Sequence, residues 1–371
     1  MNESANLVEL VERRLQEFCI ARREQLTEID PELAKVIDFI QSLLTGGKRF
    51  RALFAYWAWA SCLSINETQL GEAEKERSAA ALVDICAALE MFHAAALVHD
   101  DLLDNSDSRR GAPAVHKKFE ELHRSSGWAG SAVRFGQAGS VLAGDLMLGW
   151  SSELFDAGVK RSPSSVIAWN CRDEFAKMRV EVMAGQYLDV LEENSGPTRD
   201  PEEALGRANR VMLYKTAKYS IEAPLLIGAA FSGASPATAR GLSAFAIPLG
   251  LAFQLRDDVL GVFGAPEVTG KPAGDDLREG KRTALVALTR QTLGLSTVKI
   301  FDELMSNRDL TDEQVRLLQA TIKGSGALDK VEQMIDELGT ESLTALKELQ
   351  LDEYGKEQLE VLARKVVNRQ S

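Results

Sequence analysis

The stretch that decides the fold is SAAALVDICAALEMFHAAALVHDDLLDNSDSRRG, residues 78–111. Its first part, 78–98, is apolar and rich in alanine, which predicts a buried helix. Asp100, Asp101 and Asp104 close this helix, with Asp100 and Asp104 on one face and Asp101 beside them. Clustered carboxylates repel one another and are costly to desolvate unless a cation joins them. We interpret the cluster as a site for Mg²⁺ or Mn²⁺, which suit oxygen ligands.

Two arginines, Arg109 and Arg110, follow the carboxylates. A metal held by carboxylates does not need additional positive side chains. The carboxylates and the two arginines together therefore indicate a site for Mg²⁺ and a phosphorylated ligand. The alternative is a polar helix end that runs into an acidic loop. His93 shares the helix with the carboxylates, and it is either a ligand or an ordinary core histidine.

A second basic group precedes the stretch. The segment GGKRFR, residues 46–51, places Lys48, Arg49 and Arg51 at the start of an apolar helix expected over 52–62. Free backbone N–H groups at a helix start also favour an anion. An ordinary basic turn after a glycine cap is the alternative.

A second acidic group, FQLRDDVLG at 253–261, lies far along the chain. Asp257 and Asp258 close an apolar helix expected over 239–260, and Gln254 shares their face. Glycine-rich and basic segments follow, GKPAGDD at 270–276 and GKRT at 280–283. Two acid pairs that each end a helix and precede a basic loop are hard to explain as coincidence.

Helical periodicity extends over the whole chain, and we predict one all-helical domain over residues 1–371, a bundle with inward-facing carboxylates. The other helices are expected over 5–28, 32–44, 141–159, 165–192, 222–235, 312–323, 326–337 and 341–366. The Lys215-Thr216 pair lies inside another helix, and His116 with Lys117 and Lys118 is expected in solvent.

Net charge, cysteine spacing and hydropathy limit the classes of protein to which this chain can belong. The net charge of −12 argues against a nucleic-acid binder but permits an anionic substrate at a local basic cluster. Four cysteines without CxxC spacing indicate buried thiols in a reducing compartment. The polar N-terminus does not resemble a signal peptide, and no uninterrupted apolar run has the length of a membrane span. We therefore expect a cytoplasmic protein without a transmembrane segment.

Taken together, these motifs resemble those of the trans-isoprenyl diphosphate synthases, and most closely the geranylgeranyl diphosphate synthase group. The matching motifs are GGKRFR (46–51), HDDLLDNSDSRRG (99–111), KT (215–216), FQLRDDVLGVFG (253–264) and GKPAGDDLREGKRT (270–283). The resemblance implies an all-α fold with a deep central cavity, a homodimer, and about three Mg²⁺ ions per active site. It also implies isopentenyl diphosphate and an allylic diphosphate (dimethylallyl, geranyl or farnesyl) as substrates.

The resemblance assigns roles to single residues. The expected metal ligands are Asp100, Asp101, Asp104, Asp257 and Asp258. The allylic diphosphate would be bound by Arg109, Lys215, Lys271 and Lys281, and the diphosphate of isopentenyl diphosphate by Lys48, Arg51, His93 and Arg110. Thr216, Gln186 and Gln254 would line the site, with Asp189 as support. Lys215 is counted with the five aspartates as catalytic.

One position departs from the family pattern. The second aspartate motif often ends in a third aspartate, and here Gly261 stands in its place. Asp275 or Asp276, in the following loop, could reach the site instead.

Product length should depend on what blocks the growing chain below the first aspartate motif. Ala95 and Ala96 are small, which permits a product longer than fifteen carbons. Phe92, one helical turn deeper, is the hypothesised floor for a twenty-carbon (C20) product, or else an ordinary core phenylalanine.

Three other functions compete with a C20 synthase. The same chemistry could give a farnesyl (C15) or a longer product. A class I terpene cyclase shares the first aspartate motif, but it lacks a site for isopentenyl diphosphate. A non-catalytic partner subunit of a synthase would usually have lost one aspartate motif, and both are present here.

Overall fold

The computed structural model of the protein describes residues 3–63, 72–265, 273–307 and 309–368. Helices dominate this part of the chain, which confirms the predicted all-α class. The chain forms two compact units, and each is described by itself. Unit 1 comprises Met1–Arg172 and Ile227–Gly233, and unit 2 comprises Asp173–Leu226 and Ala234–Ser371. A single domain over the whole chain stays a prediction.

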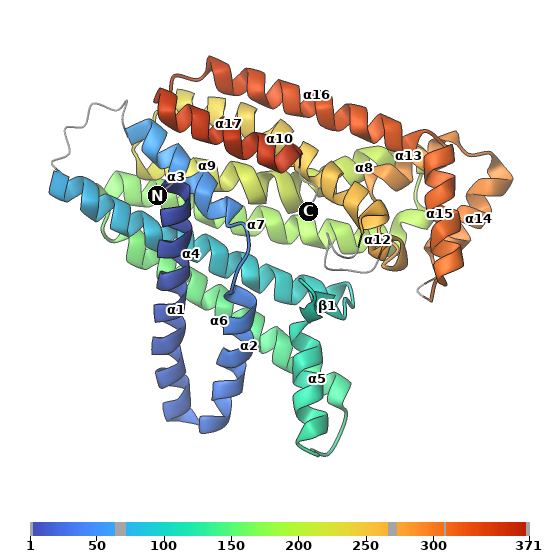
Figure 1. The fold of residues 1–371 in the computed structure, drawn as a ribbon, viewed down its shortest axis with the longest axis horizontal. Coiled ribbons are helices and arrows are strands. Elements are labelled where there is room, and N and C mark those ends of the chain that lie inside the picture. The colour runs from blue at the N-terminus through green and yellow to red at the C-terminus, as the bar shows by residue number, and fades with distance from the viewer. Residues whose placement is uncertain (1–2, 64–71, 266–272, 308, 369–371) are drawn as a thin grey trace. The chain divides into compact units, whose positions relative to one another are not determined.

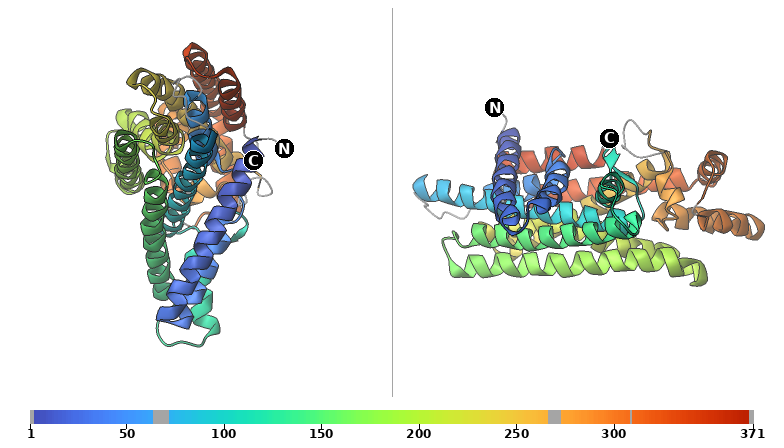
Figure 2. Two further views of the ribbon diagram at one scale, coloured as in Figure 1. Left: turned by 90° about the vertical axis from the view of Figure 1, so that its left-hand side faces the viewer. Right: turned by 90° about the horizontal axis from the view of Figure 1, so that it is seen from below.

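Unit 1 contains the N-terminal helices and the first aspartate motif. Its elements are α1 (Glu3–Ile29), η1 (Pro31–Leu33), α2 (Ala34–Leu44), α3 (Phe50–Leu63), α4 (Glu72–Leu103), β1 (Ser108–Arg109), β2 (Ala112–Pro113), α5 (Val115–Ser125) and α6 (Ala132–Val159). Helix α1 and helix α2 form a hairpin through η1, as Figure 1 shows, and they lie side by side in the right view of Figure 2. Helices α7 (Ser165–Ser195) and α9 (Ala223–Phe231) each contribute residues to both units.

Unit 2 contains the second aspartate motif. Its elements are η2 (Gly196–Thr198), η3 (Pro201–Glu203), α8 (Ala204–Val211), the π-helix η4 (Met212–Glu222), α10 (Pro236–Phe263), α12 (Asp275–Arg278), α13 (Ala284–Thr292), α14 (Leu295–Met305), α15 (Asp312–Gly324), α16 (Ala327–Glu348) and α17 (Glu353–Val367).

In unit 1, α4 packs most extensively against α6, and the two helices lie side by side in Figure 1. Glycines on α6 allow this close approach. A Cβ at Gly158 would lie 2.8 Å from the carbonyl oxygen of Ala81, and one at Gly144 would lie 2.1 Å from Nε2 of His99. A larger residue at 158 would have to push the backbone of α4 away, and one at 144 would have to displace the imidazole of His99. The end of α4 that carries the aspartates is thereby held against α6.

In unit 2, α10 is the central helix and packs against α16 and η4. The side chain of Ser342 on α16 donates a hydrogen bond to the carbonyl of Phe245 at 2.8 Å. Arg256 forms two hydrogen bonds with the carboxylate of Glu332, both at 2.7 Å. Helices α16 and α17 run beside α10 in Figure 1. These contacts hold the segment that ends in Asp257 and Asp258.

The π-helix η4 also depends on neighbouring glycines. A Cβ at Gly185 of α7 would lie 2.4 Å from the backbone nitrogen of Lys215. A Cβ at Gly250 of α10 would lie 2.4 Å from Cα of Ala217. The backbone of a π-helix is wider than that of an α-helix, and such segments are frequent at functional sites. The two glycines leave room for it at Lys215 and Thr216.

Two local predictions were wrong. Helices were expected over 326–337 and 341–366, but α16 continues through Gly339 to Glu348, because one glycine weakens a helix without ending it. The break comes later, where Asp352 caps α17 by accepting a hydrogen bond from the nitrogen of Gly355 at 3.0 Å. His116 was expected in solvent but is 2% exposed, because α5 packs its amphipathic face against α6 close to Gly136.

Four cysteines are free and buried, which confirms the prediction of buried thiols. Burial raises the pKa of Cys19 and of Cys62 to about 11, so both are protonated at neutral pH. Among the helices of the described residues, Lys75–Leu103 is long and apolar enough to cross a membrane, but 78% of its apolar window is buried inside the protein. The buried core helix of a folded domain has the same length and composition.

Candidate active site

The first aspartate motif occupies the last turn of α4 and the residues that follow. Asp101 is 2% exposed, Asp104 is also buried, and Asp100 is partly exposed. The backbone nitrogen of Asp104 donates to the carbonyl of Asp100 at 2.8 Å, and that of Ser106 donates to the carbonyl of Asp101 at 2.8 Å. The three carboxylates are thus fixed on one helix end, as the sequence predicts.

Arg109 lies against this cluster. Its Nε donates to Oδ1 of Asp101 at 2.8 Å, and its Nη2 lies 3.5 Å from Oδ2 of Asp100. Pairing of β1 with β2, with Arg109 opposite Ala112, fixes the arginine after the helix has ended. The arginine therefore offsets part of the negative charge of the cluster. Its predicted contact with an allylic diphosphate stays a prediction.

His99 connects the aspartate end of α4 to α6. Its Nε2 lies 3.3 Å from the carbonyl oxygen of Val141 and 3.7 Å from Oδ1 of Asp145. Because the imidazole ring fills the space left by Gly144, the residue directly before Asp100 is anchored by packing as well as by polar contacts.

A basic cluster surrounds His93, two helical turns before Asp100. The pKa of His93 lies well below its usual value because burial disfavours the imidazolium and four arginines repel it. These arginines are Arg51, Arg110, Arg109 and Arg49. Concentrated positive charge around a neutral histidine can bind an anion such as a diphosphate.

The GGKRFR turn supplies part of this cluster. The guanidinium of Arg110 lies against Gly47, where a Cβ would stand 3.2 Å from Nη2. Lys48 is exposed on the same turn. The structure therefore brings Arg51, His93 and Arg110 together, as predicted from the sequence.

In unit 2, a chain of hydrogen bonds leads to the second aspartate motif. The hydroxyl of Thr216 donates to Oε1 of Gln254, and Nε2 of Gln254 donates to Oδ1 of Asp258 at 2.7 Å. Among the described residues, Oδ2 of Asp258 has no hydrogen-bond partner, although the residue is only 3% exposed. Burial raises the pKa of Asp258 well above its usual value, and repulsion from Asp276 and Asp257 adds to the shift.

Two lysines expected at the site, Lys215 and Lys281, are paired with carboxylates. Nζ of Lys215 donates to Oδ2 of Asp189 at 2.5 Å. Nζ of Lys281 lies 2.8 Å from Oε2 of Glu279 and 3.7 Å from Oδ1 of Asp276. These pairs hold the ammonium groups in place but also compete with any diphosphate.

Gln186 and Lys271 were also predicted to contact the substrates. Gln186, on α7, has a buried Nε2 without a hydrogen-bond partner in the described chain. The predicted role of Lys271 lies outside the described residues.

Gly261 leaves its space to a carboxylate from another helix. A Cβ at this position would lie 2.0 Å from Oδ2 of Asp276, which is in the first turn of α12. Asp276 also contributes to the raised pKa of Asp258. A third carboxylate is therefore present beside Asp258, although it comes from residue 276 rather than 261.

The oxygen donors of the two motifs suit a hard divalent cation such as Mg²⁺. In the described part of the chain no three His, Cys, Asp or Glu side chains are placed to hold a metal ion by themselves. Mg²⁺ is often bound by one or two carboxylates together with phosphate oxygens of the substrate. The unpartnered Oδ2 of Asp258 fits a ligand of that kind.

The residues expected to set product length lie on α4. Phe92 is 1% exposed and Ala95 is fully buried, whereas Ala96 is partly exposed on the helix face that also carries His93 and Asp100. Burial of Phe92 fits both a floor and an ordinary core side chain.

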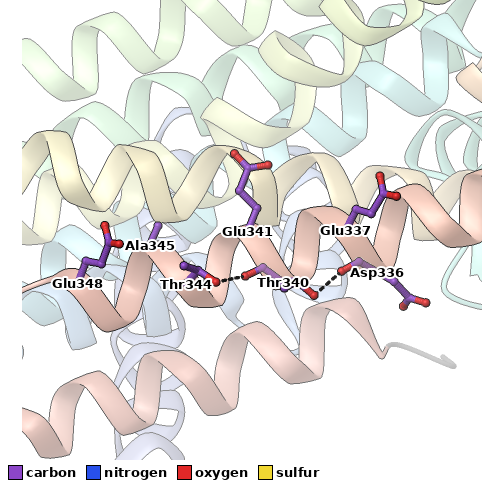
Figure 3. A pocket seen from close by; sticks show the side chains of 7 residues that line it. All are labelled: Asp336, Glu337, Thr340, Glu341, Thr344, Ala345 and Glu348. Carbon is purple, nitrogen blue, oxygen red and sulfur yellow. Dashed lines mark hydrogen bonds between the residues drawn. The ribbon is translucent and has the colours of Figure 1, made fainter.

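A separate hollow lies along α16 and has a volume of about 620 Å³. Figure 3 shows its lining residues, which all belong to this helix: Asp336, Glu337, Thr340, Glu341, Thr344, Ala345 and Glu348. Its acidic lining does not suit a diphosphate, and none of the predicted site residues lies there.

The sequence motifs gave Arg49 no role apart from its neighbours Lys48 and Arg51, and gave Glu90 no role. Nη1 of Arg49 lies 3.2 Å from Oε2 of Glu90, and both side chains are buried. The sequence signal is weak, since Arg49 is one cation of three and Glu90 stands one turn before His93.

Comparison with known proteins agrees with these motifs. The family model for polyprenyl synthetase matches residues 32–322. A "short chain isoprenyl diphosphate synthase" of Methanocaldococcus jannaschii is 31% identical over 78% of this chain and 79% of its own length. A farnesyl diphosphate synthase of Geobacillus stearothermophilus is 34% identical over 75% of this chain and 82% of its own.

A solved structure is also similar. The geranylgeranyl pyrophosphate synthase of Corynebacterium glutamicum, complexed with isoprenyl diphosphate and magnesium, superposes with a TM-score of 0.89. It is 34% identical, and the match covers 98% of each chain.

The lowered pKa of His93 predicts how stability depends on pH. Between the lowered pKa and the usual value of about 6.5 the unfolded chain binds a proton that the folded chain does not. The wild type should therefore lose stability as the pH falls below about 6.5, by at most ~1.4 kcal/mol per pH unit from this group. His93→Gln should show a shallower loss in urea unfolding at pH 7.5, 6.5 and 5.5. Because His116 is retained in both proteins, equal slopes would contradict the prediction.

Proposed function

This chain belongs to the polyprenyl synthetase family, and we propose that it condenses isopentenyl diphosphate with an allylic diphosphate to make geranylgeranyl diphosphate, a C20 product. The enzyme class, a trans-prenyltransferase, follows from the family. The family model extends over residues of both units, so the two sets of site residues are assigned to one reaction.

The observation that carries the proposal is the presence of two groups of opposite charge along α4, the carboxylates at its end and the arginines around His93. The carboxylates at 100–104 can take a diphosphate only through a cation, whereas the arginines around His93 can take one directly. A reaction between two diphosphates needs two such sites. A terpene cyclase has a single diphosphate substrate and would leave the basic cluster without a role.

Magnesium fits the donor set of both motifs. Asp100, Asp101 and Asp104 would hold it in unit 1, and Asp257 and Asp258 in unit 2. When bound, the metal neutralises negative charge on the departing diphosphate. Mn²⁺ has similar preferences, and a number of about three ions comes from the family resemblance alone.

The reaction starts with cleavage of the allylic C–O bond, in which the diphosphate leaves with the bonding electrons. Arg109, Lys215 and Lys281 would stabilise the charge on that diphosphate. Lys48, Arg51, His93 and Arg110 would hold isopentenyl diphosphate so that its alkene attacks the allylic carbon. The cation that forms with the new C–C bond then loses a proton, and this step completes the condensation. We assign the departed diphosphate as the base that accepts this proton. No protein nucleophile is needed.

Cleavage of the allylic C–O bond leaves an allylic carbocation. Polar groups of η4 and α10 can stabilise its positive charge. Thr216 and Gln254 are hydrogen-bonded to each other, and their oxygens carry partial negative charge. We assign them, with Gln186, to the lining around the allylic group, where such dipoles stabilise positive charge.

Product length is the finer part of the proposal. One relative is named for a farnesyl product and one similar structure for a geranylgeranyl product, so family membership alone permits both lengths. The small Ala95 and Ala96 favour more than fifteen carbons, and Phe92 one turn deeper favours a limit at C20. A catalytically silent subunit is the second candidate, but the chain retains the carboxylates of both motifs.

We also propose a homodimer. An exposed, mostly apolar stripe follows α7 at alternating spacings of three and four residues, the pattern of paired helices. Its residues are Val166, Trp169, Asp173, Ala176, Val180, Met183 and Tyr187. A stripe of this size on one helix is unusual for a free surface. A cytoplasmic location stays a prediction from the sequence.

A product assay tests the function. Purified protein with Mg²⁺, labelled isopentenyl diphosphate and each allylic starter should give mainly the C20 alcohol after dephosphorylation. Asp101→Asn should lower kcat/KM by ~10²-fold or more, because it removes a negative charge that would hold the metal and that lies against Arg109. A dominant C15 or C30 product would change the length but keep the chemistry. A folded protein that elongates no starter would favour the silent subunit.

Phe92→Ala should lengthen the products if this ring is the floor. Removing the ring opens space of about one isoprene unit below Ala95 and Ala96. Phe245→Ala on α10 is the matched control, since it deletes another fully buried phenylalanine and should leave product length unchanged. The measurement is chromatography of the dephosphorylated products. An unchanged length in Phe92→Ala would reject the floor.

Val180→Glu should disrupt the dimer. A charge in the middle of the α7 stripe would be buried without a partner on association. Val361→Glu on α17 makes the same change at another exposed valine and should leave the oligomeric state unchanged. Light scattering coupled to size exclusion measures the mass. A monomeric wild type would refute the dimer directly.

A further inference from the structure

The GGKRFR turn has an unusual backbone. Gly46, Gly47 and Arg49 all have positive φ, at 74°, 101° and 51°. Glycine adopts this region freely, but an arginine does so only where the surroundings hold it. Contacts of the Arg49 side chain must therefore keep the turn in this conformation.

The side chain of Arg49 points into unit 1 rather than into solvent. It is only 3% exposed, and its Nη2 donates to the carbonyl of Leu44, the last residue of α2. Nη1 lies 3.2 Å from Oε2 of Glu90 on α4, and Nη2 lies 3.6 Å from Oε1 of Glu12 on α1. One guanidinium therefore joins three helices.

Glu90 makes the second half of this connection. It is 4% exposed, and its Oε1 lies 3.4 Å from the backbone nitrogen of Ala52, in the first turn of α3. Nitrogens in the first turn of a helix lack partners within the helix, and a carboxylate there is favoured by the helix dipole. Glu90 thus joins α4 to the start of α3, directly after the turn.

The positive charge of Arg49 is offset by the carboxylate of Glu90. To bind a substrate diphosphate it would have to leave Glu90 as a buried carboxylate without its counter-ion, which is strongly unfavourable. Arg51, two residues later, lies close enough to His93 to lower its pKa, and Lys48 is exposed on the turn. Of the three neighbouring cations, Arg51 lies near His93, Lys48 is exposed, and Arg49 is buried in a pair with Glu90.

We propose that Arg49 and Glu90 are positioning residues that hold the 46–51 turn in the shape in which Lys48 and Arg51 bind the diphosphate of isopentenyl diphosphate. Neither residue touches the substrate. The inference rests on the proposed function, because it names the ligand of the basic cluster. It predicts that damage to the pair weakens binding of one substrate and spares the other.

The test compares Glu90→Gln with Glu192→Gln. Glu192 is a matched control, since it is equally buried and its Oε2 accepts a hydrogen bond from Nε of Arg207 at 2.7 Å in unit 2. Glu90→Gln should raise KM for isopentenyl diphosphate about tenfold, while kcat and KM for the allylic substrate stay within about twofold. Glu192→Gln should change stability without this split. Calorimetric binding of isopentenyl diphosphate to the metal-free protein should weaken in parallel with KM.

A second pair of variants separates support from direct binding. Arg49→Met leaves the buried carboxylate of Glu90 without its counter-ion, and it should impair binding of isopentenyl diphosphate more than Glu90→Gln does. The double variant with Arg49→Met and Glu90→Met removes both charges, and should recover at least part of the lost affinity. A ligand role for Arg49 predicts instead that the double variant binds no better than the single one.

The outcomes are distinguishable. An unchanged KM for isopentenyl diphosphate in Glu90→Gln, or no recovery in the double variant, overturns the proposal. If Arg49→Met does not fold, Glu90→Gln against Glu192→Gln still decides, because an amide keeps the shape of the carboxylate. A wild type that neither binds nor consumes isopentenyl diphosphate overturns the proposed function itself, before any variant is compared.

Discussion

Partial burial of like charges is the constraint on which this structure depends. Asp101 and Asp258 are almost fully buried beside other carboxylates, and His93 lies among arginines. Each arrangement is unfavourable for the protein alone, because charged groups are desolvated near groups of the same sign. The protein compensates in part, through Arg109 in unit 1 and Lys281 in unit 2. Metal cations and diphosphates carry the charges that would complete the compensation at each place.

Rigid packing makes this unfavourable arrangement possible. Gly144 lets His99 lie against α6, and Gly185 with Gly250 leaves room for the π-helix at Lys215. In each case a glycine on a neighbouring helix stands where any larger side chain would push away a site residue or the residue beside one. The positions of the charges are therefore determined by the shape of the helices around them as well as by their own partners.

Much of the fold and the site could be predicted from the sequence. Helical periodicity located most of the long helices, and the residue types of Asp100, Asp101, Arg109 and Asp258 indicated a chemistry before any geometry was known. The misplaced break between α16 and α17 and the burial of His116 had a different origin. The break was misplaced because a single glycine inside a helical pattern does not show whether the helix ends there, whereas the burial of His116 depends on which face of α5 is covered by α6, and local sequence carries little of that information.

The contacts between distant residues could not be predicted. Arg49 and Glu90 stand 41 positions apart, and neither looks unusual in its own segment. The same holds for the glycines that border the π-helix, because their importance comes from a backbone on another helix. Motifs identify the groups that meet the substrates, whereas the groups that hold those in place become visible only in three dimensions.

The contact between Gly261 and Asp276 restricts how this protein can change over evolutionary time. Because the carboxylate of Asp276 occupies the space of a side chain at 261, the two positions are not free to vary independently. A lineage that gained an aspartate at 261 would have to turn the carboxylate of Asp276 out of this space, which the end of a flexible side chain can do. Substitutions at 261 should therefore change where this carboxylate lies beside Asp258, and relatives with an acidic residue at both positions should hold the residue at 276 in another rotamer.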